Sequence, residues 1–372
     1  MSFRTTISYV LWPLTMWYGI GVAVRNFLYA VGIKRQEAPH ITTIGVGNLS
    51  TGGSGKTPMV EYLLRLLADS YATAMLSRGY KRKSKGYQED DGSHDAALLG
   101  DEAAMVARKF PQVQVAVCEK RVEGVRRLME QERVEQQADG GEVHVSTAPQ
   151  VVVLDDVFQH RAIKPSLNIL LTEYGNPFFK DRILPYGNLR EFKSARYRAS
   201  IVIVTKSPAR LNPVEKHNII RDLRLQNYQK VFFSYIKYLP LRTLDGKDAG
   251  IDLRKTDSVL LVSGIANPKP IVDELKRSCK LRQLVFPDHH AYTRKDVDRI
   301  KETFEAMADM RKVIVTTEKD AVRLVGLTGE LPVYVLPIEV AIHEESGIDF
   351  DQAILSTVKE NVLFLSKLSI WS

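Results

Sequence analysis

Residues 41–67 combine chemically informative residue types at an informative spacing. Residues 41–46 are rich in β-branched side chains, which predicts a strand, and residues 60–67 have the apolar spacing of a helix. Between them lies a glycine-rich loop that ends in Gly-Lys-Thr at residues 55–57. A strand, a glycine loop and a helix that begins with Lys-Thr surround phosphate groups with backbone N–H groups. The sequence therefore predicts a phosphate-binding loop.

The residues of this loop have separate predicted roles. Lys56 has the position that reaches the β- and γ-phosphates of a nucleotide, and the Thr57 hydroxyl has the position that binds Mg²⁺. The usual pattern has glycine where this chain has Ser50, but Gly52 and Gly53 still give the backbone its freedom. A glycine turn that only connects strand to helix is the alternative, and the Lys-Thr pair disfavours it. The residues expected to hold the nucleotide are Ser50, Thr51, Gly52, Gly53, Ser54, Gly55, Lys56 and Thr57.

Two adjacent acids follow a second apolar segment. Residues 150–154 predict a short buried strand, and Asp155 and Asp156 come directly after it. Acid at the tip of such a strand holds Mg²⁺ opposite a phosphate loop. Two acids at a strand end can also form a turn, but the upstream loop favours the metal role. Which of the two carboxylates holds the metal stays open.

A third acid begins a helical stretch. Asp101 precedes the segment AAMVARKF, so its carboxylate could cap the free N–H groups of a helix N-terminus. The local sequence alone favours this structural role over a chemical one.

The N-terminal segment is hydrophobic and free of charge. Residues 5–24 contain no charged side chain, and twenty helical residues cover about 30 Å, the thickness of a bilayer's hydrocarbon core. Trp12, Trp17 and Tyr18 are aromatics of the kind favoured at membrane interfaces. A buried core helix is the alternative. We expect this segment to lie in or dip into the cytoplasmic leaflet.

The composition is that of a globular protein with an anionic partner. The 372 residues are 44% hydrophobic and 26% charged, with a net charge of +8. Cys118 and Cys279 are far apart, which predicts a reducing compartment without disulfides. No module that interleaves aromatic and basic residues is present, so no nucleic-acid partner is expected.

The order of predicted elements indicates an α/β fold. Six apolar strands alternate with helical stretches, which predicts a P-loop domain built on a doubly wound parallel sheet. These strands are expected at residues 41–46, 72–76, 113–117, 150–154, 167–171 and 201–204. A second set at 258–262, 282–286, 312–315 and 333–336 predicts a second, smaller α/β domain. We therefore expect an N-terminal membrane-associated helix in 1–40, a nucleotide-binding domain over 41–228 and a smaller domain over 229–372 that closes a cleft.

The chain resembles the tetraacyldisaccharide 4′-kinases of lipid A biosynthesis over essentially its whole length. The motifs that carry the resemblance are GNLSTGGSGKTP (47–58), SRGY (77–80), GDE (100–102), LDDVFQHR (154–161), LPYGNLRE (184–191), SGIANP (263–268), PDHH (287–290) and TEKDAVR (317–323). Each is weak alone, but their order and spacing are specific. Ser50 is no departure, because that family also lacks glycine at this position, whereas Val157 stands where the family usually has glycine.

The resemblance implies a lipid kinase that uses ATP and Mg²⁺. Its reaction is phosphorylation of the 4′-hydroxyl of an acylated glucosamine disaccharide 1-phosphate, giving lipid IVA. The family's acid–base pair maps onto Asp101 and His289. The resemblance therefore implies that Asp101 is a catalytic base rather than a helix cap. Asn48, Arg78 and Arg121 are the expected substrate contacts, the two arginines at the 1-phosphate.

The implied location is the cytoplasmic face of the inner membrane, where the lipid substrate resides. No obligatory protein partner is evident. The competing interpretation is a membrane-attached P-loop NTPase switch, or a binding protein without a lipid acceptor. Thr205-Lys206 lacks the following acid that guanine recognition requires, which disfavours a guanine-nucleotide switch.

Overall fold

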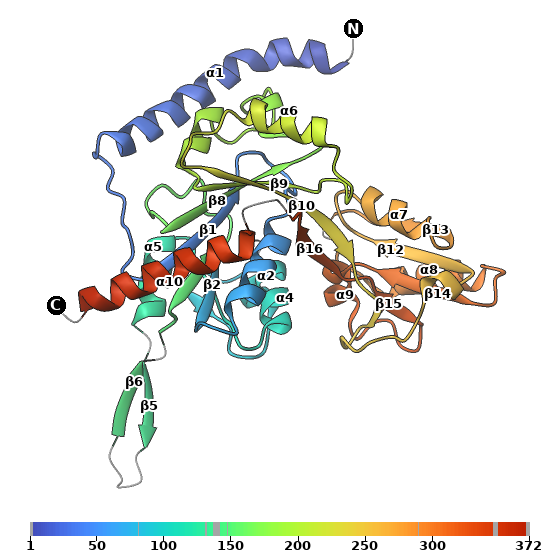
Figure 1. The fold of residues 1–372 in the computed structure, drawn as a ribbon. Helices are drawn as coiled ribbons and strands as arrows, with labels where there is room; N and C mark the ends of the chain where they lie inside the picture. The colour runs from blue at the N-terminus through green and yellow to red at the C-terminus, as the bar shows by residue number, and fades with distance from the viewer. Residues whose placement is uncertain are drawn as a thin grey trace. The chain divides into compact units, whose positions relative to one another are not determined.

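The computed structural model describes residues 3–80, 82–130, 132–136, 142–146, 148–288, 290–344 and 349–369. The chain divides into two compact units, the first comprising Met1–Ile236 and Val340–Ser372, the second Lys237–Glu339. Each unit has helices packed on a sheet whose strands are mostly parallel (Figure 1). The predicted α/β class is confirmed at this level.

The first unit is built on a nine-stranded sheet of order β16-β10-β9-β8-β1-β7-β2-β4-β3. From β10 through β4 all neighbouring strands run parallel, and the short β3 is antiparallel to β4. All six predicted strands of the first domain lie in this sheet. The strands are β1 (Thr42–Asn48), β2 (Thr73–Ser77), β3 (Gln88–Glu89), β4 (Gln114–Val117), β7 (Val151–Leu154), β8 (Leu167–Glu173), β9 (Ile201–Thr205), β10 (Lys230–Tyr238) and β16 (Ile338–Ile342).

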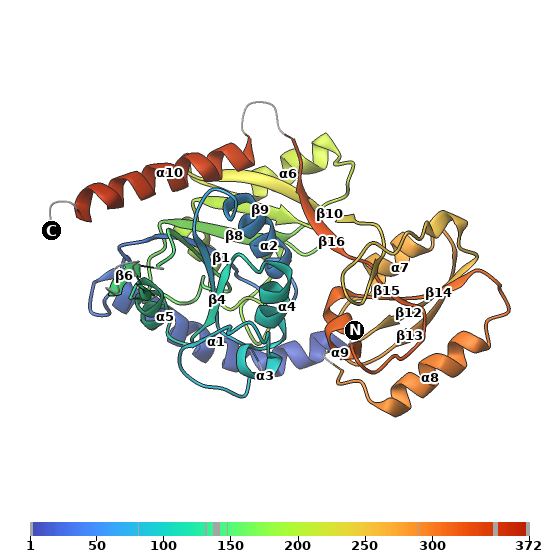
Figure 2. The same cartoon turned by 90° about the horizontal axis from the view of Figure 1, so that it is seen from below.

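Helices cover both faces of this sheet, which is why its central strands are apolar on both sides (Figures 1 and 2). One face packs against α2 (Lys56–Leu67), α4 (Asp101–Lys109) and α10 (Phe350–Ser369). The other face packs against α5 (Arg121–Met129) and α6 (Pro213–Leu223). The remaining elements of this unit are α1 (Phe3–Ala30), α3 (Ala96–Leu99), the antiparallel hairpin β5 (Glu132–Gln136) and β6 (Glu142–Ser146), and the 3₁₀ turns η1 (Phe178–Lys180) and η2 (Lys193–Arg198).

Glycine in the central strand β1 lets the segment after β7 pass close to it. A Cβ atom on Gly47 would lie 2.6 Å from the Cβ of Phe158, closer than real contacts allow. The backbone N–H of Val157 donates to the carbonyl of Val46 at 3.1 Å. The two acids at the end of β7 are thereby held beside the end of β1, where the glycine-rich loop begins.

The second unit has a five-stranded sheet of order β11-β15-β14-β12-β13, parallel except for β11. The four predicted strands of the smaller domain are all present. Thr293 and Asp296 form a capping box at the start of α8, and Thr317 caps α9. The elements are β11 (Arg242–Thr243), η3 (Leu253–Lys255), β12 (Ser258–Ser263), α7 (Lys269–Leu275), β13 (Lys280–Val285), α8 (Arg294–Glu305), β14 (Lys312–Thr316), α9 (Glu318–Leu324) and β15 (Val333–Val335).

The chain does not divide where the sequence pattern suggested. We expected residues 229–372 to form one domain, but β10 pairs in parallel with β9 in the first sheet. Residues 340–372 also return to the first unit. Phe350 and Ile354 of α10 are buried in the core formed with α2. Burial of this apolar face explains the return, since an isolated amphipathic helix would leave it in water.

Helix α1 is continuous through Pro13 and has 28 residues. Within the described part of the chain, no helix combines the length and apolarity that crossing a membrane requires.

Candidate active site

The glycine-rich loop connects β1 to α2 at the carboxyl edge of the first sheet. Gly52 and Gly55 have φ angles of 107° and 83°, in the region that favours glycine. Gly55 is the N-cap of α2, and no side chain caps this helix. The Ser54 hydroxyl is buried and makes no hydrogen bond. The loop therefore has the backbone shape and the unpaired polar groups that suit an anion at a helix N-terminus.

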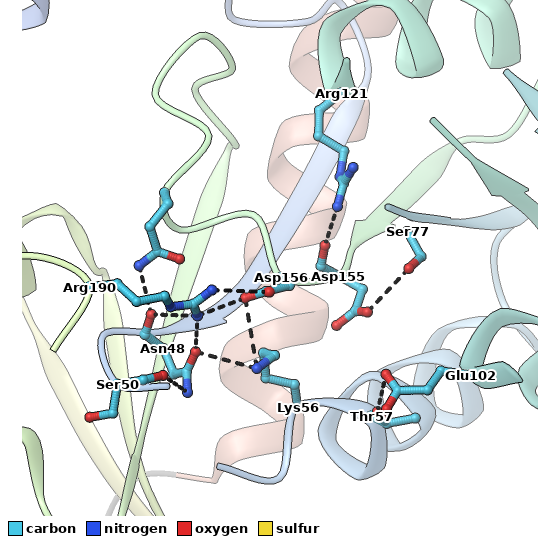
Figure 3. A network of polar contacts seen from close by, with 11 residues as sticks. Asn48, Ser50, Lys56, Thr57, Ser77, Glu102, Arg121, Asp155, Asp156 and Arg190 are labelled. Atoms are coloured by element: carbon cyan, nitrogen blue, oxygen red, sulfur yellow. Dashed lines mark hydrogen bonds and ion pairs between the residues drawn. The ribbon is translucent and has the colours of Figure 1, made fainter. Parts of the chain in front are cut away.

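Lys56 belongs to a polar network at the mouth of this loop (Figure 3). Its Nζ lies 3.8 Å from Oδ1 of Asp156 and donates to Oδ1 of Asn48 at 3.4 Å. Arg190 donates to both carboxylate oxygens of Asp156, at 2.9 and 3.2 Å, and to the side chain of Asn48. Burial alone would raise the pKa of Asp156, but the Arg190 hydrogen bonds and the Lys56 charge outweigh it and hold that pKa below its ordinary value. Asp156 is therefore an ionised partner of two cations.

Asp155 has the opposite surroundings. Its Oδ2 accepts a hydrogen bond from Ser77 at 3.4 Å, while its buried Oδ1 has no hydrogen-bond partner. Burial, then the charges of Glu102 and Asp156, raise the pKa of Asp155 to about 6. A buried carboxylate with an unpaired oxygen is stabilised by a cation. Of the two acids, Asp155 is the one with an oxygen that makes no hydrogen bond.

Thr57 and Glu102 complete this corner of the site. The Thr57 hydroxyl donates to Oε2 of Glu102 at 3.1 Å, and both point to the same region as Asp155 in Figure 3. Among the described residues, no group of three or more His, Cys, Asp or Glu side chains is placed to hold a metal ion. The donor set here is two carboxylates and a hydroxyl, which are oxygen ligands that suit Mg²⁺ when phosphate and water supply the rest.

Asp101 is not the N-cap residue of its helix. The N-cap of α4 is Gly100, with φ 87° and no side-chain capping bond, and Asp101 is the first helical residue. The predicted N-cap position is therefore wrong by one residue, because Gly100 provides the backbone turn. His289 lies outside the described residues, so its pairing with Asp101 stays a prediction.

The two arginines expected at the substrate differ in exposure. Arg78 follows β2 and is exposed, which leaves it accessible to a ligand. Arg121 is buried and donates to the carbonyl oxygens of Cys118 and Asp155 at 2.5 and 2.9 Å. Burial lowers the pKa of Arg121 to about 10. These bonds make Arg121 a support for the end of β7, and its contact with a substrate stays a prediction.

Four residues of the site had no role assigned from sequence. Glu102 and Arg190 lie in the GDE and LPYGNLRE motifs, and Gln159 and His160 in LDDVFQHR. Gln159 donates to the carbonyl of Asn48 at 2.8 Å. Burial, then the charges of Arg121 and Arg78, lower the pKa of His160 to about 4, so its ring is neutral at pH 7. For Gln159 and His160 the available signal was their position just after the strand predicted at residues 150–154.

Comparisons with known proteins agree over nearly the full length. The model of the LpxK family, described as tetraacyldisaccharide-1-P 4′-kinase, matches residues 7–359. The chain is 41% identical over 368 residues to a tetraacyldisaccharide 4′-kinase of Bacteroides thetaiotaomicron, covering 94% of this chain and 93% of that relative. A protein of the same name from Flavobacterium johnsoniae is 41% identical over 356 residues, covering 95% and 98%.

A solved structure is similar as well. The crystal structure titled as "apo" form LpxK from Aquifex aeolicus in complex with ATP superposes with a TM-score of 0.71. That protein is 28% identical to this chain, and the match covers 96% of this chain and 99% of that one.

Proposed function

The chain belongs to the tetraacyldisaccharide 4′-kinase family, and from this premise we propose that its site transfers phosphate from ATP to the 4′-hydroxyl of an acylated glucosamine disaccharide 1-phosphate. The product would be lipid IVA. One observation supports the assignment to this site. Lys56, at the start of α2, belongs to a polar network with Asn48, Asp156 and Arg190 beside the glycine-rich loop.

The glycine-rich loop is the proposed phosphate-binding loop. ATP bound there supplies the phosphoryl group that is transferred. Backbone N–H groups of the loop other than those of Thr51 and Ser54, which bond within the protein, would hold the β- and γ-phosphates, and Lys56 would neutralise part of their negative charge. Phosphoryl transfer leaves a protein mainly positioning and charge stabilisation, so a fixed cation at this place has a direct effect on rate.

We assign the Mg²⁺ ligands to Thr57 and Asp155, with Glu102 beside them. The unpaired Oδ1 of Asp155 and its raised pKa support this assignment, because a cation would neutralise a charge that burial penalises. Asp156, which sequence analysis named as an equal candidate, is instead paired with Lys56 and Arg190. In this assignment Asp156 orients the two cations.

The proposed base is Asp101, with His289 as its partner. The support is the match of both residues to the family's motifs and the place of Asp101 at the N-terminus of α4, next to Glu102. Asp101 would accept the proton of the 4′-hydroxyl as the bond to phosphorus forms. Asn48 and Arg78 are kept as proposed substrate contacts.

Membrane association through α1 is part of the proposal. The helix exposes large apolar side chains, among them Trp12, Trp17 and Phe27 at 61%, 68% and 61%. An acylated substrate resides in a bilayer, so an enzyme that acts on its sugar gains from an apolar helix in the adjacent leaflet. We place the protein at the cytoplasmic face of the inner membrane, where ATP is available.

Transfer of γ-labelled phosphate from ATP to a tetraacylated disaccharide 1-phosphate tests the proposal. We expect labelled lipid at a rate far above that of ATP hydrolysis without acceptor. Hydrolysis that is independent of acceptor, with no labelled lipid, would instead identify an NTPase switch.

A further inference from the structure

We propose that Arg25 and Tyr18 of α1 are positioning residues that hold Arg190 against Asp156, so that the N-terminal helix takes part in setting the geometry of the phosphate site. The proposal rests on the proposed kinase function. Its basis is a set of contacts between α1 and the segment 186–192, which is defined here as the bridge segment.

One stripe of α1 contacts the bridge segment along its length. The Tyr18 hydroxyl donates to the carbonyl of Arg190 at 3.0 Å, and the Thr15 hydroxyl accepts from the backbone N–H of Tyr186 at 3.1 Å. A Cβ on Gly19 would lie 3.4 Å from Phe192, so helix and bridge segment are close there. Positions 15, 18 and 19 are spaced as neighbours on one helical face.

An ion pair connects Arg25 of α1 to a buried carboxylate of the bridge segment. Glu191 is fully buried, and its Oε1 accepts a hydrogen bond from Arg25 at 2.5 Å. Its other oxygen lies 2.8 Å from Arg198, an ion pair without hydrogen-bond alignment. Loss of Arg25 would leave this buried carboxylate with Arg198 as its remaining ion-pair partner and would remove the hydrogen bond to Oε1. The position of Glu191 therefore depends on α1.

The other side of the bridge segment contacts the glycine-rich loop. The N–H of Arg190 donates to the carbonyl of Leu49 at 2.7 Å, and the N–H of Thr51 donates to the carbonyl of Asn188 at 2.7 Å. The Arg190 side chain reaches Asp156 and Asn48. Adjacent residues, Glu191 and Arg190, thus contact α1 and the phosphate site respectively.

Loss of the α1 contacts would change the charge balance at the site. Without a fixed Glu191 the bridge segment can shift, and Arg190 with it. Asp156 would then keep only the contact with Lys56, at 3.8 Å, and would compete with phosphate for that cation. The expected effect is on the chemical step rather than on membrane binding, because the exposed apolar side chains of α1 remain in place.

The test is a double-mutant cycle in the full-length protein, with lipid substrate in detergent micelles. Arg25→Ala should lower kcat about 10-fold or more while KM for ATP and for lipid change less than about 3-fold, as expected for a displaced charge. Arg25→Lys, which keeps the charge, should recover part of the loss. Arg35→Ala, an exposed arginine beyond α1, serves as the matched control and should retain normal kcat.

The decisive measurement is Arg25→Ala in an Arg190→Ala background. If α1 acts through Arg190, the second change should lower kcat less than about 2-fold further, because the two residues act as one unit. The proposal would be overturned if the kcat losses of the two single variants multiply in the double variant, or if Arg25→Ala leaves kcat unchanged. If Arg25→Ala does not fold, the same cycle with Tyr18→Phe decides. Absence of lipid phosphorylation by the unaltered protein would count against the proposed function instead.

Discussion

At the scale of single residues, Asp155 and Asp156 are neighbours in sequence with opposite electrostatic surroundings. Asp156 has a lowered pKa and pairs with Lys56 and Arg190. Asp155 has an unpaired buried oxygen and a pKa raised to about 6. Pairs of titratable groups whose surroundings push their pKa values apart identify different roles. The same chemical group is thus a fixed counter-ion at one position and a prospective metal ligand at the next.

Asp155→Asn should stabilise the metal-free protein and remove its activity. The folded pKa is raised from 3.8 to about 6, so the folded state binds the extra proton between these values and loses stability as pH rises through them. The amide avoids that loss, and we expect a gain of about 1–3 kcal/mol at pH 7.5 that shrinks by pH 5. Thermal melts with EDTA at both pH values measure it.

The matched control for this substitution is Asp298→Asn, an exposed carboxylate on α8. The melting temperature of Asp298→Asn should differ little from that of the unaltered protein. A destabilised Asp155→Asn protein, or one with normal transferase activity, would contradict the metal assignment. In the unaltered protein, the Mg²⁺ concentration needed for half-maximal activity should rise as pH falls below about 6, since a proton competes with the metal for Asp155.

Lys56→Ala should remove almost all turnover. Removing one charge contact on the transferring group commonly lowers the rate about 10²-fold or more. Lys295→Ala, an exposed lysine on α8, is the control and should leave kcat unchanged. Steady-state kinetics on proteins with similar melting temperatures make the comparison. Near-normal kcat in the folded Lys56→Ala protein would refute the phosphate-loop assignment.

Some residues of this site could be predicted from sequence and others could not, for a physical reason. The loop before α2 and the acids after β7 could be located because each is written in a local pattern. Glu102 and Arg190 are 45 and 34 residues away from the groups they bind, Thr57 and Asp156. Such contacts depend on how elements pack, and no local pattern encodes them.

At the scale of elements, α1 has one face in contact with the bridge segment and other side chains exposed to solvent. One face is fixed to the bridge segment by Tyr18 and Arg25. Trp12 and Trp17 are exposed to solvent. A charge-free segment in sequence could not indicate which side chains face the protein, because its hydropathy is high all round.

The Trp12→Glu/Trp17→Glu double variant should shift the protein from the membrane fraction to the supernatant. Two carboxylates oppose burial of this face in the headgroup region, while the contacts to the bridge segment are untouched. Flotation with vesicles of anionic and zwitterionic lipid measures the shift. Met310→Glu, at a side chain that is 95% exposed in the second unit, is the control. Unchanged flotation of the double variant would mean that another surface binds the membrane.

Six strands of the first sheet and four of the second were predicted, but the connection between the units was not. Each strand is a short apolar run bounded by polar or glycine residues, so its sequence is sufficient. Allocation of β10 and α10 to the first unit depends on strand pairing with β9 and on burial of Phe350, both long-range events. The predicted boundary placed β10 in the smaller domain, whereas pairing with β9 places it in the first sheet.

At the scale of the whole molecule, the chain leaves the first unit at Ile236 and re-enters it at Val340. Two chain crossings connect the units instead of one. The second unit is thus an insertion between β10 and β16 of the first sheet, rather than a C-terminal addition. The motifs SGIANP, PDHH and TEKDAVR all lie in this insertion. If the kinase reaction uses residues of both, the insertion contributes function and not only stability.

Joint action of Asp101 and His289 is the prediction that depends on both units. Asp101 begins α4 in the first unit, and His289 belongs to the chain of the second. Asp101→Ala and His289→Ala should each lose much of kcat while they keep ATP affinity. The double variant should be little worse than the poorer single one, because groups that act as a unit are strongly non-additive.

The pH–rate profile gives an independent reading of the same prediction. If His289 tunes or orients Asp101, the profile should contain a titration between about pH 5 and 8, where imidazole changes charge, and His289→Ala should lose it. His217→Ala on α6 is the control for a general effect of removing a histidine. Strictly additive losses of kcat, together with an unchanged pH–rate profile in His289→Ala, would show that Asp101 and His289 do not act as a unit.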